Sequence, residues 1–290
     1  MDTTLKEFEE FLGKYSYFID NMYVSPPLGD QYHGREHIKE QFHDPDKVAL
    51  FWELAELIQH YQISLEVVFN TELLGIEDFQ RTKEEFDKRN IGIDKIAVFD
   101  KYIKDVKALF PKARIVKTVN EMPNSLAEFE LIPDVYDEVV VGRQFIREKE
   151  VLQIISSQLH AVPVLLINNG CSFHCGGCRE MSHCENIYKQ DNKVWASEYL
   201  YAQQSIFPYE LHEGYLDITN IGLFKLSTRN ADTDFTARCM DSYIKNNAEE
   251  LVKEKKFNYL LWARLKWHIE HFDEFDYNRI VEIKSKMYGL

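Results

Sequence analysis

Short runs of β-branched and apolar residues alternate along the chain with longer stretches whose apolar residues recur at helical spacing. Short apolar runs of this kind are typical of strands buried on both faces. The sequence predicts strands at 22–25, 64–70, 95–99, 114–119, 138–142, 163–168 and 223–227. It predicts helices between them at 45–61, 80–89, 103–110 and 147–159. This alternation is typical of βα units around a parallel sheet.

The expected fold is an α/β, TIM-like (β/α) barrel in a single domain, residues 1–290. A complete barrel has eight strands, so either one strand escapes the pattern or the barrel is incomplete. Residues 185–215 are far longer than the usual βα loop of about 2–6 residues, and we expect them to form a lid over the barrel mouth. Residues 245–290 are expected to form a C-terminal helical extension, in which 247–269 has the clearest helical pattern.

Charge narrows the range of partners. The chain has 34 basic and 48 acidic residues, a formal net charge of -14, which disfavours nucleic acid without excluding it. The N-terminus is acidic and lacks the basic flank and apolar run of a secretory signal, and no stretch reaches the roughly 20 apolar residues of a membrane span. We therefore expect a cytoplasmic protein, in which clustered reduced cysteines indicate metal rather than disulfides.

Four of the five cysteines lie in one short segment, CSFHCGGCREMSHC. They are Cys171, Cys175, Cys178 and Cys184, and they directly follow the predicted strand at 163–168. Barrel active sites are built where the strands end, at their carboxyl termini. Closely spaced thiolates in one loop commonly hold an iron–sulfur cluster, so a 4Fe-4S cluster is the preferred interpretation.

Other interpretations of the cysteines stay open. Structural zinc uses similar ligands but usually two separated pairs, and inert buried cysteines usually have apolar surroundings, whereas this segment is polar. The spacing of Cys171, Cys175 and Cys178 also matches that of radical S-adenosylmethionine enzymes. Those enzymes carry the motif after the first strand of the barrel. Here five predicted strands precede the strand at 163–168, which leads into the cysteine segment. The aromatic residue usual before their third cysteine is replaced by Gly177.

Several segments together resemble peptidase family U32, the collagenase-like peptidases. They are IDKIAVFDKYIKDVKALFP with Asp100, DEVVVGRQFIREKEVLQII, LLINNGC, and IGLFKLSTRNADTDFTARCMDSYI with Phe224, Lys225 and Arg229. The similarity runs over residues 93–244.

The resemblance implies a barrel and, from the family's iron–sulfur branches, oxygen-independent hydroxylation or a related modification of a small molecule or RNA. Cys171 and Cys178 match the spacing of the family's first two cluster cysteines. The third, Cys184, comes early, and no cysteine stands shortly before Phe224. The choice between Cys184 and Cys239 as the last ligand is therefore left open.

Four polar residues near predicted strand ends are candidate substrate ligands. Lys225 and Arg229 lie four residues apart in the family-like motif, and Arg143 follows another strand. These cations suit an anionic small-molecule substrate, although ordinary surface ion pairs would use the same residues. Asn168 ends the strand before the cysteines, where its amide could bind substrate or simply cap a turn.

A redox enzyme is the preferred function. The alternatives are a radical S-adenosylmethionine enzyme, a U32-type peptidase, and a non-catalytic accessory protein with a structural metal and a protein partner. The sequence lacks a Gly-x-Ser-x-Gly elbow and a His-Glu-x-x-His zinc pair, so a peptidase function would depend on the resemblance alone.

Overall fold

The structure is a computed structural model, which describes residues 4–32, 36–69, 71–121, 123, 125–142, 145–146, 148–167, 206, 208–218, 220–226 and 233–246. Seven strands are found there: β1 (Asn21–Val24), β2 (Ser64–Val68), β3 (Lys95–Val98), β4 (Arg114–Lys117), β5 (Glu138–Val140), β6 (Val162–Leu166) and β7 (Leu223–Lys225). They belong to one parallel sheet in which the strand order follows the sequence order. An α/β fold with a parallel sheet is therefore confirmed.

Helices precede the first strand, occupy connections between strands and follow the last strand. The longer ones are α1 (Leu5–Tyr15), α3 (Pro45–His60), α4 (Ile76–Asp87), α5 (Ile103–Leu109), α7 (Lys149–Gln158) and α11 (Thr233–Lys245). Shorter ones are α2 (Glu36–Gln41), α6 (Leu126–Glu130), α10 (Pro208–Glu210) and the π-helix η6 (Leu211–Tyr215). The predicted helices at 45–61, 80–89, 103–110 and 147–159 correspond to α3, α4, α5 and α7.

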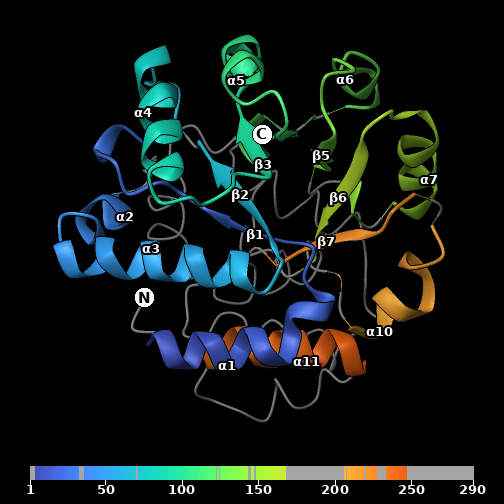
Figure 1. Ribbon diagram of the computed structural model, residues 1–290. Helices are drawn as coiled ribbons and strands as arrows, with labels where there is room; N and C mark the ends of the chain where they lie inside the picture. The colour runs from blue at the N-terminus through green and yellow to red at the C-terminus, as the bar shows by residue number, and fades with distance from the viewer. Residues whose placement is uncertain are drawn as a thin grey trace, which may run out of the picture. The chain divides into compact units, whose positions relative to one another are not determined.

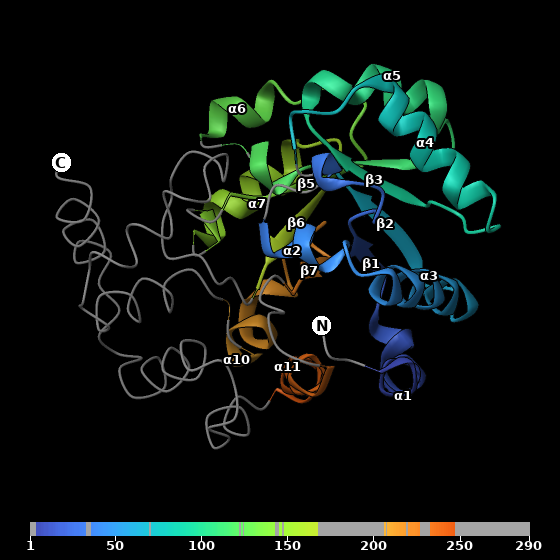
Figure 2. The same cartoon turned by 90° about the vertical axis from the view of Figure 1, so that its left-hand side faces the viewer.

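Contacts divide the chain into two compact units. The amino-terminal unit comprises Asp2–Val140 with His160–Val162, and the carboxyl-terminal unit comprises Val141–Leu159 with Pro163–Leu290. The first unit contains β1 to β5, and Figure 2 shows α3, α4, α5 and α6 following one another around the outer side of these strands. In the second unit, β6 pairs with β7, and α10 packs against α11 (Figure 1).

Local sequence signals explain where several helices begin. Thr4 and Glu7 form a capping box at the start of α1, in which the Glu7 carboxylate accepts the Thr4 amide at 2.8 Å. Asp44 caps α3, and Pro45 occupies its first turn, where no amide donor is required. Ser125 caps α6 in the same way as Asp44 caps α3.

The two faces of the amino-terminal sheet differ in character. The face toward the helices carries buried apolar side chains from β2, β3, β4 and β5, including Leu65, Ile96 and Ile115. On the opposite face, Val68, Ala97 and Val116 form a small cluster against Tyr23. That inner face also carries charged residues near the amino ends of the strands, which is unusual because a buried charge is costly unless it is paired.

Two predicted regions fall mainly on residues that the structure leaves undescribed. Of the expected lid at 185–215, only Ile206 and the turns of α10 and η6 are described. Of the expected C-terminal extension at 245–290, only Lys245 and Asn246 are described. Both expectations stay predictions.

Candidate functional site

Most of the residues predicted from the sequence to form the site lie outside the described part of the chain. These are Arg143, Asn168, Cys171, Cys175, Cys178, Cys184 and Arg229. Lys225 is described: it is the last residue of β7 and is half-buried. In the parallel pairing of β6 with β7, Lys225 lies opposite Leu166. In the sequence, Cys171 stands five residues after Leu166.

The backbone around the carboxyl end of β6 is fixed by hydrogen bonds. The Ile167 amide donates to the Lys225 carbonyl at 3.1 Å, and the Ile206 amide donates to the Ile167 carbonyl at 2.8 Å. Ile167 and Ile206 are both buried. They are also the described residues on either side of the undescribed stretch 168–205.

Helix α11 contributes a side chain to the same place. The Tyr243 hydroxyl lies 2.7 Å from the Ile206 carbonyl oxygen and 3.2 Å from that of Ile167. The Tyr243 carbonyl in turn accepts the His212 Nε2 proton at 2.6 Å, which ties η6 to α11. Cys239, one helical turn before Tyr243, is buried in α11.

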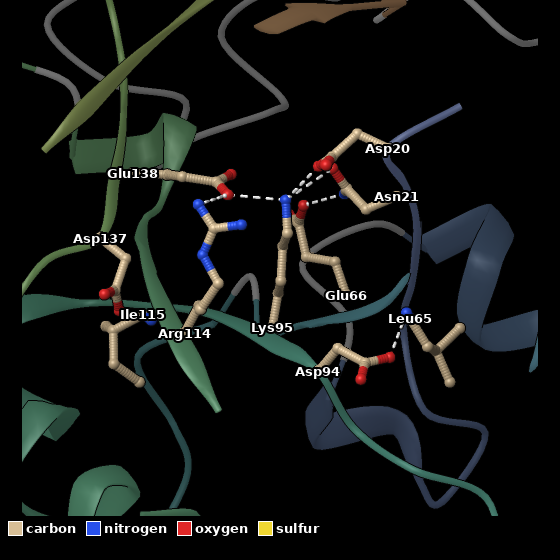
Figure 3. Close-up of polar contacts among 10 residues, drawn as sticks. All are labelled: Asp20, Asn21, Leu65, Glu66, Asp94, Lys95, Arg114, Ile115, Asp137 and Glu138. Atoms are coloured by element: carbon tan, nitrogen blue, oxygen red, sulfur yellow. Dashed lines mark hydrogen bonds and ion pairs between the residues drawn. The ribbon is translucent and has the colours of Figure 1, made fainter. Parts of the chain in front are cut away.

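A second polar cluster lies at the opposite ends of the strands, on the inner face of the amino-terminal unit (Figure 3). Its centre is Lys95, the first residue of β3, whose side chain is 0% exposed. The Lys95 ammonium forms an ion pair with Asp20, which precedes β1. It forms a second ion pair, at 2.6 Å, with Glu138, the first residue of β5. Arg114 lies 2.8 Å from the same Glu138 oxygen, and Asn21 accepts a Lys95 proton at 3.1 Å.

These contacts require the inner face of β1 to β5 to be concave. In a flat sheet β1 and β5 would lie about 19 Å apart, four spacings of about 4.8 Å. Asp20 and Glu138 nevertheless both contact the ammonium of Lys95 on the central strand β3. Only a strongly curved sheet brings carboxylates from its two outer strands onto one side chain.

A repeated backbone device adjoins this cluster. Asp94, which precedes β3, accepts the Leu65 amide of β2 at 2.9 Å, and Asp137, which precedes β5, accepts the Ile115 amide of β4 at 2.6 Å. Each aspartate therefore satisfies the second amide of the strand before its own (Figure 3). In each of the dipeptides Asp94–Lys95 and Asp137–Glu138, the aspartate accepts a backbone amide of the neighbouring strand. The residue after it, Lys95 or Glu138, then places its side chain in the inner ion cluster.

The chemistry of this cluster is that of a structural element. Asp20, Glu66 and Glu138 provide three carboxylates against the cations of Lys95 and Arg114, and Glu66 accepts a proton from the Asn21 amide. Asp20 and Glu138 form ion pairs with Lys95, Glu138 forms another with Arg114, and buried Glu66 is held by the neutral Asn21 amide. In parallel barrels the amino-terminal ends of the strands serve stability, whereas the carboxyl ends carry catalysis.

Asp100, part of the family-like segments, lies at the other end of β3. Its carboxylate accepts protons from the Lys117 ammonium and the Tyr136 hydroxyl. Burial, together with the hydrogen bond to Asp100, raises the pKa of Tyr136 well above its ordinary value. By strand register Lys117 points to the helix-covered side of the sheet, so these contacts join β3, β4 and the segment before β5 as a packing element.

Two features are absent from the described residues. They contain no group of three or more His, Cys, Asp or Glu side chains placed to hold a metal ion. They also contain no helix that is long and apolar enough to cross a bilayer. The four clustered cysteines lie outside the described residues.

Sequence reasoning missed both Lys95 and Tyr243. A lysine and a glutamate opening the runs KIAV and EVV could have signalled charged inner-face positions, because each disrupts an otherwise apolar strand. No comparable signal marked Tyr243, because its partners lie 76 and 37 positions away in the sequence.

Comparison with known proteins adds no relative to this picture: no family model matches the chain, and no curated protein matches it significantly.

Proposed function

We propose that the chain is an iron–sulfur protein whose Cys171, Cys175, Cys178 and Cys184 hold a 4Fe-4S cluster beside the carboxyl ends of β6 and β7. The observation that carries this proposal is the register of Lys225 with Leu166, five residues before Cys171. It supports an exit of the cysteine segment at the strand ends where parallel α/β proteins build their sites. The donor set also fits, because clustered thiolates are the usual ligands of iron–sulfur clusters.

We further propose that the protein is a redox enzyme acting on an anionic organic substrate, as the resemblance to the iron–sulfur branches of family U32 implies. When bound, the cluster would supply one-electron chemistry. Lys225, at the end of β7, is suited to binding a substrate anion, and Arg229, Arg143 and Asn168 are proposed to assist it. A hydroxylation or related modification is the reaction class expected from the resemblance.

The finer fold is part of the same proposal. The sequential order of seven parallel strands is the order found in a (β/α) barrel. The concave inner face imposed by the Lys95 contacts supports the same curvature within the amino-terminal unit. We propose a barrel-like closure that places the strand ends, and with them the cysteine segment, around one mouth.

Anaerobic purification followed by iron and acid-labile sulfide assays tests the cluster. The proposal expects about four of each per chain, with a brown protein that bleaches in air. A colourless protein with one zinc per chain would rule out the cluster in favour of a structural zinc site.

Substituting Cys178 by serine then separates an enzyme from an accessory protein. A catalytic cluster predicts lost activity with the fold largely retained, whereas an accessory role predicts a large loss of stability. Candidate substrates come from metabolites or RNA modifications that differ between cells with and without the protein. A Lys225→Met variant should keep its iron but bind the substrate anion more weakly.

A further inference from the structure

We draw no further inference here: the strongest candidate, the buried ion cluster around Lys95 at the amino-terminal ends of β1, β3 and β5, belongs to the packing already described, because Asp20, Glu138 and Arg114 are held by ion pairs within it and nothing in the described part of the chain indicates what ligand it would bind.

Discussion

Lys95 and Glu138 form a buried ion pair between the first residues of β3 and β5, with 2.6 Å between Nζ and Oε1. The exposed fractions of their side chains are 0% and 2%. Since neither charge can turn to water, each depends on the other and on the surrounding partners. Removing one partner of such a pair leaves the other charge buried and unpaired, which typically lowers the free energy of unfolding by about 3–5 kcal/mol.

We therefore expect Lys95→Met to lower the free energy of unfolding by about 3 kcal/mol or more. Urea unfolding monitored by circular dichroism measures this change. Lys83→Met is the control, because Lys83 pairs with Asp87 on the exposed surface of α4, where an ion pair contributes less than about 1 kcal/mol. The double variant Lys95→Met with Glu138→Gln should be more stable than Lys95→Met alone. Equal stability of Lys95→Met and Lys83→Met would contradict the structural role of the cluster.

The paired aspartates before β3 and β5 give a second prediction. Asp94→Ala leaves the Leu65 amide without its 2.9 Å acceptor, and Asp137→Ala does the same to the Ile115 amide at 2.6 Å. Each change should cost about 1–3 kcal/mol, the usual effect of leaving a backbone donor unsatisfied. The matching Asn variants keep an acceptor oxygen and should lose less. The unfolding midpoints of the four variants measure this difference, and Asn variants as unstable as the Ala variants would disprove it.

The secondary structure was largely predictable from the sequence, because it depends on local signals. All seven predicted strands correspond to observed strands, since each is a short apolar run between polar or turn residues. Helix α1 was missed, although Thr4 and Glu7 spell a readable capping box. Its buried residues Phe8, Phe11, Leu12 and Tyr15 also recur at helical spacing, so the same periodicity that predicts the other helices marks this one.

The polar contacts were less predictable, because they join positions far apart in the sequence. Asp20 and Lys95 are 75 positions apart, and no local rule brings them together. Curvature of the sheet does so, and curvature is a property of all five strands at once. For the candidate site, spacing identified the cysteines, an apolar run identified the strand before them, and the family-like motif identified Lys225 near a strand end. The hydrogen bonds of the Tyr243 hydroxyl depend on how α11 packs, which the sequence does not state.

Alkaline pH gives a third prediction, through Tyr32. This side chain is buried, and its hydroxyl donates to the Asp78 carbonyl at 2.9 Å. Burial, the largest cause, raises the pKa of Tyr32 to about 12, above the ordinary value of 10.0. The folded protein therefore holds this proton more tightly than the unfolded chain does. The resulting stability is complete below pH 10 and is lost as the pH rises toward 12.

Urea unfolding between pH 9 and pH 11.5 tests the effect of Tyr32. As the pH rises above 10, the free energy of unfolding should fall more steeply in the wild type than in Tyr32→Phe. The difference in slope should reach up to about 1.4 kcal/mol per pH unit. Tyr17→Phe is the control, because Tyr17 is 91% exposed and should not alter the pH dependence. Identical pH dependence in the wild type and Tyr32→Phe would show that Tyr32 ionises alike in the folded and unfolded states.

The identity of the fourth cysteine ligand gives a fourth prediction. Cys184 belongs to the clustered segment, whereas Cys239 is 2% exposed within α11, among packed residues. A buried cysteine usually behaves as a small apolar residue. We therefore expect Cys184→Ser to lower the iron content and Cys239→Ser to leave it close to that of the wild type. Iron and sulfide assays after anaerobic purification measure both, and the reverse result would make Cys239 the ligand.

The last prediction separates the proposed enzyme from a radical S-adenosylmethionine enzyme. In the radical class three thiolates leave one iron open to the cofactor, and the motif follows the first strand of the barrel. Here Cys171 follows β6, and only β7 comes later among the described strands. Gly177 also stands where that class usually has an aromatic residue. Added S-adenosylmethionine should therefore leave the electron paramagnetic resonance signal of the reduced cluster unchanged.

The same incubation should release no 5′-deoxyadenosine, because the cofactor would find no vacant iron from which it could be reduced and cleaved. Cys184→Ser sharpens the comparison, since in a radical enzyme the fourth cysteine is dispensable for the cluster. A radical enzyme predicts full iron content and cofactor cleavage in this variant, whereas the proposed protein predicts a depleted cluster and no cleavage. Stoichiometric 5′-deoxyadenosine from the wild type would replace the U32-like proposal with the radical one, regardless of where the cysteines fall in the order of strands.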